Sequence, residues 1–452
     1  MIKRIAQRVR TSYWLRSGAF TFLQRFSIAL FGFFSFVILV RLLSVTDFGV
    51  WVLYTSFVAV IELVREGFVR NPLIRGFIST NEDKHSLIIG ASLLINLGLF
   101  VLLAVLIATF SHHLSSWMSA PSLELLFYLY IPNAFLHTFF LHFTVLHEAH
   151  FNFKATFWTH FVQKLIFLLY LLPFVFVSFA HSISLPALAV VQIVATAIGL
   201  GIALYHARRY SVFRPRFDLA HFKVVFNHGK YSFGTNISSM LLNNIDSWML
   251  GSMISPAAVA VYNPALRITR LVEVPMSAVG AITYPKLVRK DNGSALDNTK
   301  HLYEKSVATI LAMMLPVVIG VIVLSYPIVR LIAGDGYEEA APVLQVIMLY
   351  GLIAPFNRQF GNTLDAIGKA HLTFYFVLAS ALLNSALNYF MILNYGVMGA
   401  AIATITTHFV GLILRQLFLR HLLDVSLLNI LVQSLNWYKF GAQKVLSFRS
   451  KD

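Results

Sequence analysis

The sequence has no cysteine and few charged residues. Because none of its 452 residues is Cys, disulfide bonds and thiolate metal sites are excluded. Charged side chains make up only 12% of the chain and hydrophobic ones 58%, whereas charged residues form about 25% of a typical soluble domain. This composition is typical of a protein with several membrane-spanning helices.

The sequence also lacks the motifs of common ATP-dependent and zinc-dependent enzymes. A phosphate-binding loop needs Gly five positions before its Gly-Lys pair and Ser or Thr after it. Around Gly368 and Lys369, these two places hold Thr363 and Ala370. A zinc protease needs two histidines four positions apart, but the HEAH stretch at residues 147–150 places them three apart. We therefore expect no ATP hydrolysis and no bound metal, and the transporter-like architecture described below leads us to expect that the protein is not an enzyme.

Long apolar runs are the dominant pattern. FSIALFGFFSFVILV (residues 26–40) and ASLLINLGLFVLLAVLIATF (residues 91–110) belong to segments long enough to cross ~30 Å of hydrocarbon as helices. Transmembrane β-strands would be shorter and would alternate in hydrophobicity. We therefore predict an all-α polytopic membrane protein with twelve transmembrane helices. The predicted spans are residues 14–40, 47–66, 86–110, 122–148, 155–180, 184–206, 231–254, 257–285, 303–330, 341–366, 370–394 and 398–421.

The connections between successive predicted spans lie alternately on the two sides of the membrane, and basic residues are concentrated in every second connection. Lys and Arg are frequent in the N-terminal arm and in residues 207–230, whereas the opposite connections are nearly bare and include the acidic GDGYEEA (residues 334–340). Because cytoplasmic loops carry an excess of Lys and Arg, both termini are predicted to be cytoplasmic. The same rule explains the net charge of +16 without a nucleic-acid partner. The short outer connections leave no room for an extracytoplasmic domain.

The two halves of the chain resemble each other. LLSVTDFGVW (residues 42–51) aligns without gaps on MISPAAVAVY (residues 253–262), at an offset of 211. SLPALAVV (residues 184–191) precedes GVMGAAIA (residues 396–403) by 212. Such a parallel repeat predicts two six-helix bundles, an architecture typical of transporters. The predicted parts are an N-terminal lobe (1–206), a basic cytoplasmic linker (207–230), a C-terminal lobe (231–421) and a basic cytoplasmic tail compatible with an interfacial helix (422–452).

Several ionisable residues fall inside the predicted spans. Each costs roughly 2.5–3.5 kcal/mol at the bilayer centre, so such residues usually face a cavity or a partner. Basic residues outnumber acidic ones among them, and a positive interior suits an anionic substrate such as a phosphate or pyrophosphate. The candidates that we single out are Arg25, Glu62, Arg65, Asp246, Arg267, Arg270 and Glu273.

Two alternatives stay open for these charges. Arg267 lies about 15 Å into the eighth predicted span, near the midplane, at about 1.5 Å per residue. Arg270 and Glu273 are three positions apart, so either they form an ion pair that tolerates burial or Arg270 is left for the substrate. Asp246 either neutralises Arg25 or Arg267, or binds a coupling proton or sodium ion.

Two segments resemble a known family. NNIDSWMLGSMISPAAVAVYNPALRITRLVEVP (residues 243–275) resembles the seventh-to-eighth helix region of polysaccharide flippases, the O-antigen and exopolysaccharide translocases. RLLSVTDFGVW (residues 41–51) is similar to the first helical hairpin of the same family. Its superfamily also contains the multidrug extruders (MATE) and the lipid II flippase. The resemblance implies a MATE-like, V-shaped transporter with two six-helix lobes.

The resemblance also implies a function. Such a transporter moves an undecaprenyl-pyrophosphate-linked oligosaccharide, an O-antigen or exopolysaccharide repeat unit, across the bacterial cytoplasmic (inner) membrane by alternating access. Arg25, Arg267 and Arg270 stand where family members use arginines for the pyrophosphate, and Arg65 is a weaker match. The candidates for a coupling or a structural charge are Asp246, Glu273 and Glu62.

Other functions stay open. A drug or cation antiporter of the same superfamily needs acidic cavity residues, which the surplus of basic residues disfavours. A membrane polysaccharide polymerase or ligase generally needs a sizeable outer loop, which the short outer connections disfavour. The expected partners are the lipid-linked oligosaccharide and membrane lipids, with a polysaccharide polymerase and other assembly proteins as further candidates. No cofactor is expected beyond a coupling proton or sodium ion.

Overall fold

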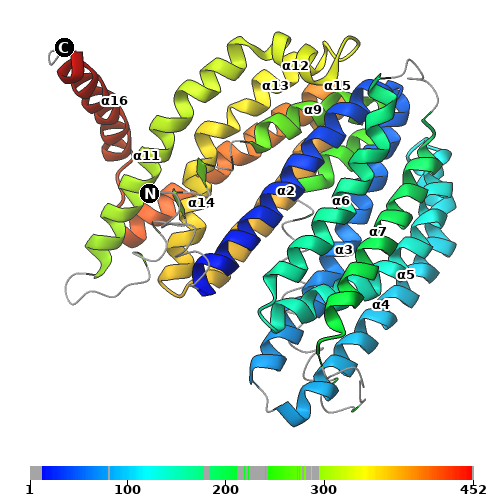
Figure 1. Ribbon diagram of the computed structural model, residues 1–452. Helices are drawn as coiled ribbons and strands as arrows, with labels where there is room; N and C mark the ends of the chain where they lie inside the picture. The colour runs from blue at the N-terminus through cyan, green and yellow to red at the C-terminus, as the bar shows by residue number, and fades with distance from the viewer. Residues whose placement is uncertain are drawn as a thin grey trace. The chain divides into compact units, whose positions relative to one another are not determined.

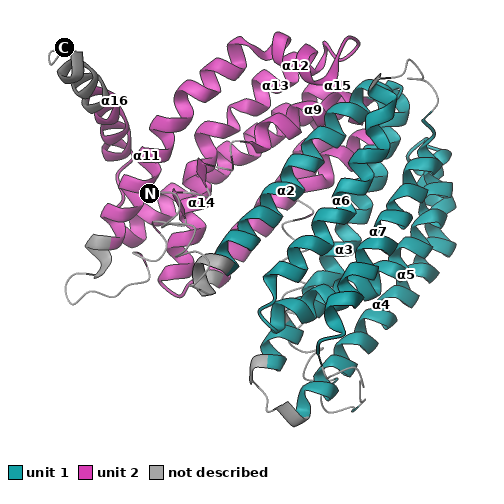
Figure 2. Ribbon diagram, in the orientation of Figure 1, with its two compact units in different colours: residues 1–237, 255–257 teal, residues 238–254, 258–452 magenta. Residues whose placement is uncertain are grey.

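The structure is a computed structural model that describes residues 13–79, 82–176, 183–210, 243–271 and 295–449, and ten single residues between 218 and 287. All regular secondary structure in these residues is helical (Figure 1), as predicted. Contacts between helices divide the chain into two compact units (Figure 2). Unit 1 comprises residues 1–237 and 255–257, and unit 2 comprises residues 238–254 and 258–452.

Unit 1 contains six long helices that match the first six predicted spans. They are α2 (Tyr13–Leu42), α3 (Val45–Ser79), α4 (Glu82–Trp117), α5 (Ser122–Ala149), α6 (Phe153–Phe176) and α7 (Leu185–Ala207). Helix α5 packs against α3, α4 and α7, and α2 packs along α6. Side chains from three different helices therefore meet around α5.

Helices α3 and α4 are longer than predicted. The predicted spans 47–66 and 86–110 stop where polar residues become frequent, but both helices continue beyond these limits. Arg70 stays helical in α3 because its guanidinium pairs with Glu66 one turn earlier, at 2.6 Å, and with Glu148 of α5, at 3.0 Å. An apolar run therefore marks where a helix crosses the membrane and does not mark where the helix ends.

Unit 2 contains the remaining helices, and several of them are broken. They are α9 (Pro256–Arg270), α11 (Ala295–Val323), α12 (Ser325–Ala333), α13 (Ala340–Met348), α14 (Tyr350–Ala366), α15 (Ala370–Leu423) and α16 (Leu427–Arg449), after a helical segment at 243–253. Contrary to prediction, the spans 303–330 and 341–366 each consist of two helices, and α13 meets α14 at 41°. Pro327 follows the first break by three residues, and proline lacks the N–H that would continue the preceding turn.

The number of spans is only partly tested. Eight of the described helices are long and apolar enough to cross a membrane, or nine if α13 and α14 form one bent span. Parts of the predicted seventh and eighth spans (231–254 and 257–285) and most of the predicted linker (207–230) lie outside the described residues. The count of twelve and the domain boundaries therefore stay predictions. The tail contains helix α16, whose placement at a membrane surface also stays a prediction.

Helix α15 joins the last two predicted spans, 370–394 and 398–421, through a sharp break. Gly396 has φ 57° and ψ −135°, a conformation that residues with a Cβ rarely adopt. Three residues later, a Cβ added to Gly399 would lie 2.0 Å from the carbonyl oxygen of Met391. The break between the two spans therefore requires glycine at both positions.

Replacing Gly399 with leucine is expected to destabilise unit 2 by roughly 1–3 kcal/mol or more, the usual range for overpacking. The new side chain would meet backbone atoms, which cannot move aside as a flexible side chain can. Thermal unfolding of the purified protein in detergent measures the effect. Gly98→Leu is the matched control, because a Cβ on Gly98 of α4 meets nothing within 4 Å. Equal melting temperatures for the two variants would contradict the prediction.

The helix starts support the predicted internal repeat. Helix α3 begins at Val45 and α9 at Pro256, which are 211 positions apart. Helix α7 begins at Leu185, and the break in α15 lies at Gly396, again 211 positions later. Helix starts and breaks at matching positions indicate that the two halves share one helical layout.

Each unit has an apolar core of its own. In unit 1, Phe68 of α3 and Ile88 of α4 belong to one buried cluster. In unit 2, Tyr303 of α11, Phe360 of α14 and Leu419 of α15 belong to another. A polar or charged group buried near such residues costs free energy unless it has hydrogen-bond partners. Each buried charge of the two units therefore needs polar partners.

Candidate functional site

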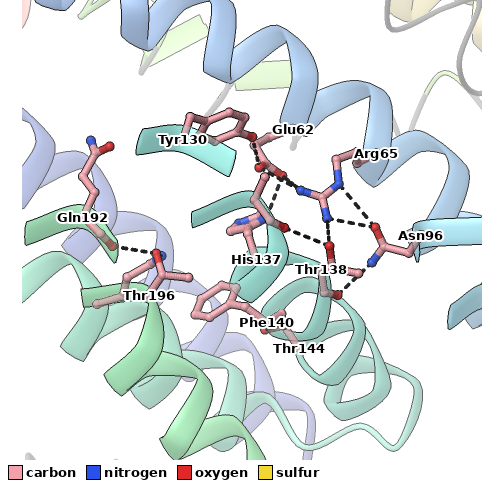
Figure 3. Close-up of polar contacts among 12 residues, drawn as sticks. Glu62, Arg65, Asn96, Tyr130, His137, Thr138, Phe140, Thr144, Gln192 and Thr196 are labelled. Carbon is pink, nitrogen blue, oxygen red and sulfur yellow. Dashed lines mark hydrogen bonds and ion pairs between the residues drawn. The ribbon is translucent and has the colours of Figure 1, made fainter. Parts of the chain in front are cut away.

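The first buried charge network lies in unit 1 and centres on Arg65 of α3. The side chain of Arg65 is 2% exposed. Its guanidinium donates to Glu62 Oε1 at 3.1 Å, to Asn96 Oδ1 of α4 at 3.1 Å and to Thr138 Oγ1 of α5 at 2.5 Å (Figure 3). One arginine therefore ties three helices of unit 1 together.

Glu62, one turn before Arg65, has two further partners. Nδ1 of His137 lies 2.6 Å from Glu62 Oε2, and the hydroxyl of Tyr130 donates to Glu62 Oε1 (Figure 3). Asn96 completes the network by donating to the carbonyl oxygen of Thr138 at 2.8 Å. The carboxylate of Glu62 is thus held by an arginine, a histidine and a tyrosine from α3 and α5.

This geometry changes the interpretation of Arg65 and Glu62. A substrate-binding arginine must present its donors to a ligand, but Arg65 directs them to side chains of its own helix bundle. The weaker prediction that Arg65 contacts the substrate is not supported by this arrangement. Glu62 is matched by the cationic Arg65, as a structural charge would be.

The second buried carboxylate is Asp246 in the helical segment 243–253 of unit 2. It is 5% exposed and accepts three hydrogen bonds from neutral donors. Asn388 Nδ2 donates to Oδ1 at 2.5 Å, and the hydroxyls of Tyr262 and Thr404 donate to Oδ2 at 2.8 and 2.7 Å. Asn388 also donates to Asn384 Oδ1 at 3.0 Å. Four polar side chains from α9 and both arms of α15 therefore surround one carboxylate.

No cationic side chain in the described part of the chain forms an ion pair with Asp246. Neutralisation of Arg25 or Arg267 by Asp246 therefore stays a prediction, and within unit 2 the printed partners of the carboxylate are neutral. A buried carboxylate that has hydrogen bonds but no counter-charge is an energetically costly arrangement. Binding a proton or a small cation would remove that cost, so the coupling alternative stays open.

The predicted substrate arginines are exposed on their helices. Arg267 and Arg270 lie in the last turn of α9 on the face opposite the buried Ile268 and Thr269. Arg25 is exposed on α2 of unit 1. Their predicted role in binding a pyrophosphate stays a prediction.

Glu273 is exposed in unit 2 and does not form an ion pair with Arg270 in the structure. The predicted alternative, in which Glu273 holds Arg270, is therefore not observed.

Sequence reasoning missed the partners of these charges. Asn96, His137 and Thr138 in unit 1, and Asn388 and Thr404 in unit 2, were not among the candidates. The available signal was a polar residue inside an apolar run, as with Asn96 in the middle of α4. Such a signal marks a residue that needs a partner but does not identify the partner.

A buried arginine in unit 2 was also missed. Arg415 of α15 is 7% exposed and donates to Asn357 Oδ1 at 2.7 Å and to Ser380 Oγ at 3.0 Å. Its guanidinium carbon lies 5.9 Å from the ring centre of Phe360 and 6.0 Å from that of Phe376. Neutral acceptors and aromatic faces thus satisfy this charge inside the apolar core. Among the described residues, no cluster of His, Asp or Glu is suited to hold a metal ion.

Comparison with known proteins identifies relatives named for glycan and polysaccharide biosynthesis. Residues 38–342 match a family described as polysaccharide biosynthesis protein. The probable low-salt glycan biosynthesis flippase Agl15 of Haloferax volcanii is 23% identical over 216 residues, which are 48% of this chain and 45% of that protein. The chain spans about half the length of the curated relatives it matches.

Solved transporter structures share the fold. The lipid II flippase MurJ in an inward closed conformation has a TM-score of 0.73 at 15% identity, covering 92% of this chain and 90% of that one. An inward-facing multidrug resistance MATE family transporter of the MOP superfamily also has a TM-score of 0.73, at 13% identity, covering 88% and 94%. The predicted MATE-like transporter fold is confirmed, and the protein belongs to the polysaccharide biosynthesis protein family.

Proposed function

We propose that the protein is a flippase that moves a lipid-linked oligosaccharide across the cytoplasmic membrane by alternating access. The observation that carries the proposal is the pair of arginines, Arg267 and Arg270, exposed on one face of α9 in a membrane-embedded family member. Charged side chains exposed on a membrane helix need a water-filled path or an anionic ligand. A lipid-linked oligosaccharide brings such an anion, its pyrophosphate, into the membrane.

The proposed site residues are Arg25, Arg267 and Arg270. A guanidinium binds phosphate oxygens through two parallel N–H donors, which gives geometric selectivity as well as charge. Arg65 is left out because its donors are already used inside unit 1. The substrate class is an undecaprenyl-pyrophosphate-linked repeat unit of O-antigen or exopolysaccharide. The protein acts without altering the substrate covalently, so we propose that it is not an enzyme.

Proteoliposomes test the proposal directly. A lipid-linked oligosaccharide with a fluorophore on the sugar is reconstituted with the purified protein, and a membrane-impermeant quencher is added outside. Transport exposes the fluorophore of the inner leaflet to the quencher, so the quenched fraction rises beyond that of protein-free vesicles. The same rise with a phosphatidylcholine that carries the same fluorophore would show unselective scrambling and contradict the proposal.

A drug or cation antiporter is the second candidate. It is favoured by Asp246, a buried carboxylate without a cationic partner among the described residues. The fold does not separate the candidates, since the flippase and the multidrug transporter match equally well. Raised resistance of expressing cells to cationic drugs, with no transport of the lipid-linked oligosaccharide, would favour the antiporter.

We propose that Asp246 couples transport to a proton or sodium gradient. Its partners are neutral donors, so its charge is free to be compensated by an incoming cation. Glu62 is less suited because Arg65 and His137 already hold it, and Glu273 is exposed. We also propose that the protein lies in the inner membrane with both termini in the cytoplasm. Its proposed protein partners are a polysaccharide polymerase and other assembly proteins.

Replacing Asp246 with asparagine is expected to remove most of the stimulation by an ion gradient, a loss on the order of tenfold. Asparagine has nearly the same size but no charge to exchange. Transport in proteoliposomes with and without an imposed proton or sodium gradient measures the effect. Asp365→Asn is the control, because Asp365 is exposed near the end of α14. Full gradient stimulation in Asp246→Asn would exclude the coupling role.

A further inference from the structure

A groove opens between α6 and α7 of unit 1, away from both charge networks. Its cavity volume is about 640 Å³. On α6 it is lined by Lys154, Trp158 and Val162, which are spaced four residues apart and so lie on one face of the helix. The groove is therefore built from a continuous helical stripe and is not an irregular gap between loops.

The second wall of the groove is the outward face of α7. Ala195, Gly199 and Ala203 are buried on the inward face, where a Cβ on Gly199 would lie 2.9 Å from Phe140 of α5. Ile198 and Gly201 line the groove and are exposed, and a Cβ on Gly201 meets nothing within 4 Å. Small residues thus hold α7 close to α5, while its other face remains open to the surroundings of the helix bundle.

Residue chemistry changes in order along the groove. Lys154 on α6 and His206 on α7 lie at one end, and Trp158 and Tyr205 lie near them. Val162 is two turns deeper, about 12 Å from the cationic end at ~1.5 Å per residue. On α7, Ile198 lies eight positions before His206, at the matching depth. The groove presents cationic, then aromatic, then aliphatic side chains.

This order matches a membrane lipid from headgroup to acyl chain. Aromatic side chains prefer the membrane interface, and basic pockets between membrane helices on the cytoplasmic side bind anionic headgroups. By the predicted topology, the start of α6 and the end of α7 lie on the cytoplasmic side. The exposed Arg208 and Arg209 directly follow α7 and add positive charge there.

Lys154 is available to an external anion. It is exposed, and no carboxylate within the described ranges forms an ion pair with it. We propose that the groove binds one anionic phospholipid of the cytoplasmic leaflet, with its phosphate at Lys154 and an acyl chain along Val162, Ile198 and Gly201. The phospholipid is bound as a resident of the bilayer and is not the transported substrate, so the inference is independent of the proposed function.

Native mass spectrometry of the full-length protein in non-ionic detergent tests the inference. Phosphatidylglycerol and phosphatidylcholine with identical acyl chains are added in equal amounts, and the bound lipids are counted. The wild type is expected to retain more phosphatidylglycerol. Lys154→Gln is expected to lower the ratio of bound phosphatidylglycerol to phosphatidylcholine about fivefold, the usual effect of one basic residue at a membrane surface. Lys305→Gln, at an exposed position of α11, is the control.

A second pair of variants tests the acyl-chain part of the groove. Gly201→Trp is expected to fill the groove and to reduce binding of both lipids at this site, whereas Gly98→Trp on α4 is not, although both glycines face open space. Size-exclusion chromatography establishes that the variants fold. If Gly201→Trp does not fold, the lipid ratio of Lys154→Gln alone tests the inference. An unchanged lipid ratio in Lys154→Gln would overturn the inference.

Two competition experiments exclude other anions. Inorganic phosphate at millimolar concentration is expected to leave phosphatidylglycerol bound, because it lacks an acyl chain. Displacement by inorganic phosphate would show a simple anion site and overturn the inference. Undecaprenyl phosphate is expected to compete poorly, and displacement of phosphatidylglycerol at an equal concentration would assign the groove to the lipid carrier instead.

Discussion

Replacing Arg267 with alanine is expected to slow transport of a pyrophosphate-linked oligosaccharide roughly 10- to 100-fold. A hydrogen bond to a charged group contributes about 1.5–3 kcal/mol, and about 1.4 kcal/mol corresponds to a factor of ten. Arg267 is exposed on α9, so its removal leaves no cavity in the core and the protein should fold normally. The rate of quenching in proteoliposomes, divided by the amount of folded protein, measures the effect.

Two variants serve as comparisons for Arg267→Ala: a lysine at position 267 and the removal of an arginine elsewhere in the chain. Arg267→Lys keeps the charge but loses the two parallel donors, so its rate is expected between those of wild type and Arg267→Ala. Arg330→Ala is the control, because Arg330 is 76% exposed and pairs only with Asp335 among its described neighbours, at 2.9 Å. An undiminished rate in both Arg267→Ala and Arg25→Ala would remove the arginines from the proposed site.

Arg25 and Arg270 provide the second half of this test. All three arginines are exposed on their own helices, two on α9 and one on α2. If they bind the same pyrophosphate, the effects of Arg267→Ala and Arg270→Ala will not add, since residues that share a partner couple by roughly 0.5–3 kcal/mol. Additive losses would indicate that the two α9 arginines act on different parts of the transport cycle.

The membrane spans and the repeat could be predicted because they are local patterns. A run of apolar residues identifies a crossing helix without reference to the rest of the chain. The alignment of residues 42–51 with 253–262 predicts that a helix starts at equivalent positions in the two segments. In the structure, α3 and α9 start at such equivalent positions. The glycine at position 396 marks the boundary between the last two spans, where α15 breaks.

The charge networks could not be predicted because they depend on contacts between distant helices. Glu62 and Arg65 are one turn apart and were both singled out from the sequence, but Asn96 and Thr138 join them from two other helices. The same holds for Asp246, whose donors Asn388 and Thr404 are 142 and 158 positions away in the sequence. An exposed and a buried arginine have the same sequence signature, so only the structure separates Arg267 from Arg65.

Replacing Arg65 with leucine is expected to destabilise the protein by about 3–5 kcal/mol, the usual result of removing one partner of a buried ion pair. Glu62 would lose its arginine, and the oxygens of Asn96 and Thr138 would lose their donor. Thermal unfolding in detergent, with the yield of monodisperse protein, measures this loss. Arg330→Leu, which breaks only an exposed ion pair, is expected to cost about 1 kcal/mol or less.

The double variant Glu62→Gln with Arg65→Leu separates packing from transport. Without the carboxylate, the leucine no longer leaves a buried charge unpaired, so we expect at least half of the lost stability to return. If Arg65 acts only inside unit 1, transport per folded molecule will recover together with stability. If stability recovers and transport does not, the network around Glu62 takes part in the transport cycle. In that case, the exposure of an arginine does not by itself identify its function in this fold.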